Sequence, residues 1–222
     1  PNKVACLAML ARVYLTMEDY ANAGTYAQKA LLLTKELIDY NTLSASDAFP
    51  LPAALPSGNV EALFYSVLNN LTTLSAASTT TTIAPSLYNS YEADDLRRVI
   101  LFTPRGAGQV FKGSYAKSSA IFAGLSVNEL YLIAAECYAR ADQKDASLAL
   151  LNTLLVNRFK KNSFKPLSAS TSEEALRLVL QERRKELVAR EIRWTDLRRL
   201  NADARFAVTI TKSYNGSSYE LT

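Results

Sequence analysis

Two parts of the chain, residues 4–38 and 126–160, share one pattern of apolar and small residues. In each part apolar residues recur at helical spacing, a short polar break follows, and alanines recur along the next helical stretch. This pattern is typical of a tetratricopeptide-like pair of antiparallel helices, in which small residues lie where the helices touch. One pair cannot bury its own apolar face, so the two predicted hairpins must pack on each other, on a further helix, or on parts outside this chain. The sequence therefore predicts a mainly α fold.

The residues between the hairpins, 41–122, are predicted to form a long irregular insertion that contains short strands. Residues 41–59 are rich in Ser and Pro, and residues 75–82 are a Ser/Thr/Ala stretch, so we expect both to be loops. Residues 61–68 are compatible with a strand or a helix. From 85 to 122 the insertion carries aromatic residues and glycines. Long insertions of this kind often carry the function of a protein.

A third helical region, residues 172–201, is predicted to be one charged helix. Its leucines fall at helical repeats, and Arg184 and Glu191 continue the same stripe where apolar residues would be expected. Glu186 and Arg190 stand four positions apart, in the order that favours an ion pair on a helix. We therefore expect these four residues to form structural ion pairs that hold the helix against the hairpins. The hairpins, the insertion and this helix are predicted to form a single domain over all 222 residues.

The basic residues of this third region also raise the possibility of nucleic-acid binding. Seven of them lie between Arg183 and Arg199, but Glu182 precedes them directly and three further acidic residues are interleaved with them. A phosphate-binding surface needs cations that are not already paired, so the mixed charge favours a structural helix over a nucleic-acid interface. The whole chain has 25 basic and 21 acidic residues, a balance that does not point to a polyanionic partner.

Several classes of enzyme are disfavoured by the composition. The chain has no histidine, which removes the Ser-His and Cys-His nucleophile pairs and most zinc ligand sets. Glu92, Asp94 and Asp95 lie close together in the sequence, but Arg97 and Arg98 follow them, so these carboxylates are expected to be ion-paired. We expect no catalytic residue and no cofactor and assign no metal ligand, and metal binding by Asp94 and Asp95 is left open.

The two cysteines, Cys6 and Cys137, lie inside apolar helical patterns, so we expect buried thiols and leave their redox state open. Cys6 is not expected to carry a lipid, because no hydrophobic stretch precedes it. The apolar runs of the chain are also shorter than the roughly 18 residues that a membrane-spanning helix needs.

The charged region carries a two-part motif, Glu-Arg-Arg-Lys-Glu-Leu at residues 182–187 and Arg-Trp-Thr-Asp-Leu-Arg-Arg-Leu-Asn at residues 193–201. Its order and spacing resemble the late signature of the SusD/RagB family. That family commonly has a glycine between the two halves, where this chain has Glu191 and Ile192. Further resemblance lies in the hairpin segments 8–15 with Asp19 and Tyr20, in 124–140 with 150–152 and Arg158, and in the run 94–98 with Lys112.

This resemblance implies a non-catalytic, glycan-binding lipoprotein on the outer-membrane surface of Bacteroidetes. Such a protein binds oligosaccharides or polysaccharides and delivers them to a TonB-dependent, SusC-like transporter. The resemblance also implies that the chain is a fragment that lacks the N-terminal region and the extreme C-terminus of the family. Membrane association would then come only from a lipid anchor absent from this chain. Trp194 lies in the motif and is expected to be part of the core.

The aromatic residues of the insertion can be interpreted in two ways. Rings on loops can present an apolar face to a sugar while nearby polar side chains bind its hydroxyls, or they can pack the insertion onto the hairpins. Packing is expected for Phe102 and Phe122, which lie in apolar runs. The candidates for glycan contact are Tyr88, Asn89, Tyr91, Arg105, Phe111 and Tyr115. A second hypothesis is a helical-repeat scaffold that binds a protein and no sugar.

Overall fold

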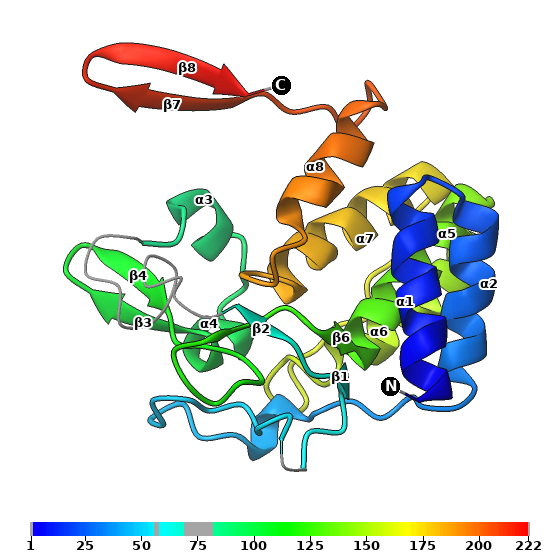
Figure 1. The fold of residues 1–222 in the computed structure, drawn as a ribbon, viewed down its shortest axis with the longest axis horizontal. Helices are drawn as coiled ribbons and strands as arrows, with labels where there is room; N and C mark the ends of the chain where they lie inside the picture. The colour runs from blue at the N-terminus through cyan, green and yellow to red at the C-terminus, as the bar shows by residue number, and fades with distance from the viewer. Residues whose placement is uncertain (1, 56–57, 69–81, 222) are drawn as a thin grey trace.

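The computed structural model describes residues 2–55, 58–68 and 82–221. Helices gather in one part of the molecule, and the insertion forms a second part of short strands and loops beside them (Figure 1). The prediction of a mainly α fold is confirmed. The longer helices are α1 (Lys3–Thr16), α2 (Tyr20–Leu31), α5 (Val127–Arg140), α6 (Lys144–Leu155), α7 (Ser172–Glu186) and α8 (Arg193–Asn201).

The first hairpin is formed by α1 and α2. The Asn2 side chain accepts a hydrogen bond from the backbone N of Ala5 at 2.9 Å, and Asp19 caps α2 in the same way through Asn22. Between the helices, Glu18 has a φ of 61°, which turns the chain tightly. Small side chains line the contact between the helices and let the backbones approach closely. The buried alanines are Ala5, Ala8, Ala11, Ala23, Ala27 and Ala30.

The second hairpin, α5 and α6, packs on the first through α2 and α5. At this contact a Cβ on Gly24 would lie 3.0 Å from the Cβ of Cys137, so a larger residue than glycine would crowd the two helices. α5 also packs on α6 and α7, and most of its residues are buried. Of the packing alternatives that the sequence left open, the structure shows the hairpins packed on each other and on α7. The central position of α5 also buries three of its polar side chains, those of Asn128, Glu129 and Glu136.

The charged region is two helices rather than the predicted single helix over 172–201. α7 ends at Glu186, and α8 begins at Arg193. In the connecting segment Ala189 has a φ of 53° and Glu191 a φ of 60°, left-handed conformations that interrupt a helix. Glu191 stands where the SusD/RagB family commonly has a glycine, and its backbone adopts the conformation that glycine favours.

The insertion contains short strands, as predicted. β1 (Ala62–Phe64) pairs with β6 (Leu125–Ser126), and β2 (Val67–Leu68) pairs with β5 (Ile121–Phe122), so residues 61–68 are extended rather than helical. β3 (Phe102–Arg105) and β4 (Gly108–Phe111) form a hairpin. The other elements are the 3-10 helix η1 (Tyr40–Thr42) and the short helices α3 (Pro85–Tyr88) and α4 (Arg97–Ile100). Of the predicted loop at 75–82, residues 75–81 lie outside the described residues.

Gly124 lies at a close approach between the insertion and α5. A Cβ at this position would lie 1.9 Å from the carbonyl oxygen of Phe64, a distance that only a shift of the backbone could relieve. The same glycine accepts hydrogen bonds through its own carbonyl oxygen, from Arg12 at 2.7 Å and from Arg190 at 3.1 Å. Gly124 therefore lets β1, α1 and the segment after α7 meet at one point.

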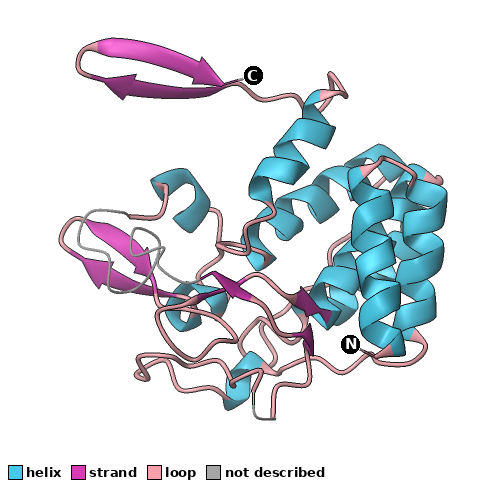
Figure 2. Ribbon diagram, viewed as in Figure 1, coloured by secondary structure: helices cyan, strands magenta, loops and turns pink. Residues whose placement is uncertain are grey.

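The C-terminal residues form a hairpin that the sequence analysis did not predict. β7 (Ile210–Tyr214) and β8 (Ser217–Leu221) are joined by a two-residue turn at Asn215 and Gly216, both with positive φ. Asn-Gly is the preferred sequence of such a turn, so the signal was present in the sequence. Figures 1 and 2 show the hairpin projecting away from the rest of the molecule.

The two cysteines differ in environment, so the expectation of two buried thiols is wrong for one of them. Cys6 is exposed on α1, whereas Cys137 is buried between α2 and α5. Burial, together with the nearby charge of Glu136, raises the pKa of the Cys137 thiol to about 12. Within the described residues, none of the helices combines the length and the apolar character that a membrane span requires.

Candidate functional site

Three of the six predicted glycan contacts lie in the core of the insertion, which is a correction to the sequence analysis. Tyr91, Phe111 and Tyr115 are each only 2% exposed. The Tyr91 hydroxyl donates a hydrogen bond to the carbonyl oxygen of Lys185 at 2.8 Å, and the Tyr115 hydroxyl donates to Glu61. Phe102 and Phe122, for which packing was predicted, are buried with them. These rings hold the insertion together and have no face free for a ligand.

The other three candidates reach the surface on adjoining elements. Tyr88 ends α3 and is half-buried; its ring meets Phe102 edge-on at 5.7 Å between centroids. Asn89 follows it and is exposed, and Arg105 is exposed at the end of β3. The segment that leads into α3 is bonded to β4, through the backbone N of Ile83 and the carbonyl oxygen of Gln109 at 2.7 Å. α3 and the β3–β4 hairpin therefore form one surface, here called the α3–β4 face.

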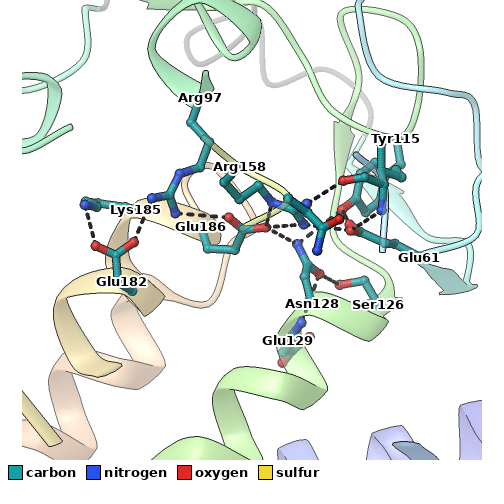
Figure 3. Close-up of polar contacts among 12 residues, drawn as sticks. Glu61, Arg97, Tyr115, Ser126, Asn128, Glu129, Arg158, Glu182, Lys185 and Glu186 are labelled. Carbon is teal, nitrogen blue, oxygen red and sulfur yellow. Dashed lines mark hydrogen bonds and ion pairs between the residues drawn. The ribbon is translucent and has the colours of Figure 1, made fainter. Parts of the chain in front are cut away.

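A buried network of charged side chains joins the insertion to the helices (Figure 3). Arg97, the first residue of α4, is completely buried and binds three carboxylates. Its guanidinium lies 2.7 Å from Asp95, 2.7 Å from Glu182 and 3.1 Å from Glu186. Lys185 adds a second cation beside Glu182. Arg97 thereby ties the insertion to α7.

Arg158 is the second buried arginine of the network and links three parts of the chain. Its Nη2 lies 2.6 Å from Glu61 of the insertion, and its Nε donates to Glu186 of α7 at 2.9 Å. Its Nη1 donates to the carbonyl oxygen of Ile38 at 2.7 Å, next to the first hairpin. The side-chain amide of Asn128 on α5 also donates a hydrogen bond to the Glu186 carboxylate, at 2.8 Å. Glu186 is thus the point at which both arginines and α5 meet.

The electrostatics of the network suit a structural role. Burial alone would raise the pKa of Glu186, but Arg158 and Arg97 outweigh burial and lower it to about 2. A general acid for glycoside hydrolysis needs a raised pKa, so that it carries a proton at neutral pH. Glu186 therefore remains ionised and bound to arginine. Among the described residues, no group of three or more carboxylates and thiols is arranged to hold a metal ion.

The four predicted ion-pair residues do not pair as expected. Arg184 and Glu191 are exposed, because the buried side of α7 carries Val179, Arg183 and Glu186 rather than the stripe that runs through Arg184. Opposite charges do lie on the buried side of α7, but they belong to Arg183 and Glu186 rather than to Arg184 and Glu191. Glu186 is paired with Arg97 and Arg158 instead of Arg190.

Arg190 is buried, and its partners are uncharged. Its Nη2 donates to the carbonyl oxygen of Gly124 and to the Ser126 hydroxyl at 3.0 Å. Its guanidinium also lies over the Phe122 ring, 4.5 Å from the centroid. Burial lowers the pKa of Arg190. It therefore anchors the segment after α7 to the insertion, and within the described ranges it does so without an ion pair.

A second buried cluster holds α8 against α5 and α7. Arg199 of α8 binds Glu136 of α5 through both terminal nitrogens, at 2.5 and 2.8 Å. Asp196, also on α8, accepts from Arg183 of α7 at 2.9 Å and from Arg199 at 3.0 Å. The polar residues of the two-part motif thus connect three helices.

Trp194 is 54% exposed, which contradicts the expectation that it belongs to the core. α8 turns Arg199 and Asp196 inward, and the indole falls on the opposite side of this short helix. Tyr65 is a further exposed ring that the sequence analysis did not single out, and it lies beside Phe122 at 6.2 Å. The exposure of Trp194 was missed because the helical periodicity of α8 was assigned to a longer helix, and the local sequence carried no signal for the exposure of Tyr65.

Comparisons with known proteins agree with this architecture. A model of the SusD family matches residues 127–221, which include α5 to α8 and the C-terminal hairpin. Among curated proteins, none matches the chain.

Solved structures extend the similarity over the whole chain. A SusD-like carbohydrate binding protein from Bacteroides vulgatus is 20% identical, with a TM-score of 0.66 over 100% of this chain and 51% of its own. A SusD-like protein from Bacteroides fragilis is 14% identical, with a TM-score of 0.71 over 98% of this chain and 58% of its own. A SusD superfamily protein from Bacteroides vulgatus is 21% identical, with a TM-score of 0.69 over 99% and 52%. The chain spans about half the length of these structures, and the likeness establishes a shared fold.

Proposed function

We propose that the chain is a SusD-family protein, since a model of that family matches residues 127–221, and that it binds oligosaccharides or polysaccharides without cleaving them. One solved structure with the same fold is described as a SusD-like carbohydrate binding protein. The chemistry of the buried carboxylates supports binding without catalysis, since Glu186 is held ionised by two arginines.

The α3–β4 face is the proposed contact surface, and one observation carries this assignment. Of the six candidates, Tyr88, Asn89 and Arg105 are those that reach solvent, and they lie on adjoining elements. An aromatic ring can stack on the C–H face of a sugar, while amide and guanidinium groups donate hydrogen bonds to its hydroxyls. Phe102 supports the Tyr88 ring from beneath. Arg98 lies over the same ring at 4.8 Å and limits how a sugar approaches it.

Replacing Tyr88 with Ala should weaken oligosaccharide binding by about 1–3 kcal/mol, by analogy with the stacking of bases on aromatic side chains. Isothermal titration against a panel of oligosaccharides would measure the change. Tyr214→Ala is the matched control, because this tyrosine is 65% exposed near the turn of the C-terminal hairpin. Thermal unfolding of both variants would show that each is folded. Equal affinities for wild type and the folded Tyr88→Ala protein would assign the ring to packing.

The biological role that we propose is nutrient uptake at the outer-membrane surface. The family resemblance supports delivery of the bound glycan to a TonB-dependent, SusC-like transporter and attachment to the membrane through a lipid.

Docking of a protein is a second candidate function, which the β7–β8 hairpin favours. Strand alternation places Ile210, Lys212, Tyr214 and Tyr219 on one face, and all four are exposed. Thr211, Ser213, Ser218 and Glu220 lie on the other face, so the large apolar side chains of the hairpin gather on one side, around Lys212. We propose that the apolar side contacts the transporter. Co-purification of the transporter that is lost on replacing both tyrosines with Ser, with glycan binding unchanged, would support this; retention would contradict it.

A further inference from the structure

A pocket lies at the bend between α7 and α8, beside the proposed glycan surface. Its volume is about 420 Å³, and Leu87 of α3, the residue before Tyr88, forms part of its wall. A second hollow of about 280 Å³ continues from it and shares Arg184, Arg193 and Leu197. The other apolar lining residues of the pocket are Leu187, Val188, Ala189, Ile192, Val208 and Ile210.

The polar part of the pocket carries an excess of positive charge. Arg183, Arg184 and Arg193 line it, against one carboxylate, that of Asp196. Asp196 is already bound by Arg183 and by Arg199 behind it. Among the described residues, neither Arg184 nor Arg193 forms an ion pair. Partial desolvation and the neighbouring charges of Arg184 and Arg199 lower the pKa of Arg193, and together they outweigh the opposing effect of Asp196.

Two further groups at the pocket lack hydrogen-bond partners. Arg183 is 3% exposed, and its Nη1 has no acceptor within the described part of the chain. An unpaired buried donor of this kind carries a cost that an incoming acceptor would relieve. α8 also begins here, and Ile192 at its N-cap supplies no side-chain acceptor to the first turn. The positive end of the α8 dipole adds to the charge of the arginines.

We propose that this pocket binds the carboxylate of an acidic sugar, a uronic acid residue within a glycan. Guanidinium groups match the planar geometry of a carboxylate and can bind it through two parallel hydrogen bonds. The apolar walls suit the C–H faces of a pyranose ring. α3 contributes Tyr88 to the α3–β4 face and Leu87 to the pocket wall. One oligosaccharide chain could therefore reach from the face into the pocket. This inference rests on the proposed function, glycan binding, and specifies that the bound glycan is negatively charged.

The test uses a panel of oligosaccharides that contain galacturonate or glucuronate, together with their methyl esters, which keep the sugar and remove the charge. We expect the acids to bind about tenfold or more tightly than their esters, the gain typical of hydrogen bonds to charged groups. The double variant Arg184→Gln/Arg193→Gln should lose this preference. Arg198→Gln is the control, because Arg198 is exposed on α8, the helix that also carries Arg193, and is not part of the pocket. Both changes are on the surface, and thermal unfolding would verify the fold.

Each outcome separates this inference from the function on which it rests. Equal binding of acids and esters, or a preference that survives in the double variant, would overturn the pocket assignment and leave carbohydrate binding intact. Binding of no member of the acidic panel or of a neutral panel would overturn both. Binding of an acidic peptide at the same arginines, without any uronate, would overturn the assignment of the pocket to a sugar.

Discussion

Replacing Glu186 with Gln is expected to lower the free energy of unfolding by about 3 kcal/mol. Breaking a buried ion pair by removing one partner typically costs about 3–5 kcal/mol, because the remaining charge stays buried. Glu186 binds Arg97 and Arg158 at once, so the change affects two buried cations. The lower end of the range applies because Arg97 keeps Asp95 and Glu182, and Arg158 keeps Glu61.

Urea unfolding followed by circular dichroism would measure this loss. Glu173→Gln provides the control on the same helix, where an exposed carboxylate pairs with Arg177 at 2.8 Å. Water screens such surface pairs, so the control should unfold close to the wild-type midpoint. A Glu186→Gln protein as stable as the control would show that the network does not hold the insertion to α7.

Acidification should destabilise the protein progressively between about pH 4.5 and pH 2. The pKa of Glu186 is about 2 in the folded protein, against an ordinary value of 4.5. At pH values above 4.5 the carboxylate is ionised in both states, and its contribution to stability is fully present. As the pH falls toward 2, the unfolded chain takes up the proton first, and the contribution is lost. The difference corresponds to about 3 kcal/mol for this one group.

Other carboxylates should act in the same direction. Arginine partners lower the pKa values of Glu129, Glu136 and Asp196 against the opposing effect of burial. Unfolding free energies measured from pH 7 to pH 2 would test the prediction, and the Glu186→Gln protein should have a shallower dependence. If wild type and variant lose stability equally over this range, Glu186 is not the group responsible.

The sequence predicted the helical hairpins well because their signal is local. Alanines at Ala23, Ala27 and Ala30 recur at helical spacing, and small residues are needed wherever two helices lie close together. The same reasoning failed in the charged region. The stripe through Arg184 assumed one continuous helix, but the left-handed residues Ala189 and Glu191 end it and redirect the chain.

The candidate site was less predictable, because the burial of a ring depends on contacts between distant segments. Tyr115 becomes part of the core through Glu61, and Tyr91 through the carbonyl oxygen of Lys185 on α7. Neither contact has a pattern in the local sequence. Trp194 shows the reverse case, since its motif suggested a core position and the short helix α8 leaves it exposed.

The most direct test of the account is calorimetric titration of the wild-type protein with neutral and acidic oligosaccharides, with mass spectrometry of the ligands afterwards. The account predicts saturable binding of at least one oligosaccharide and an unchanged mass for every ligand. Absence of binding across both groups, or the appearance of shortened oligosaccharides, would contradict it.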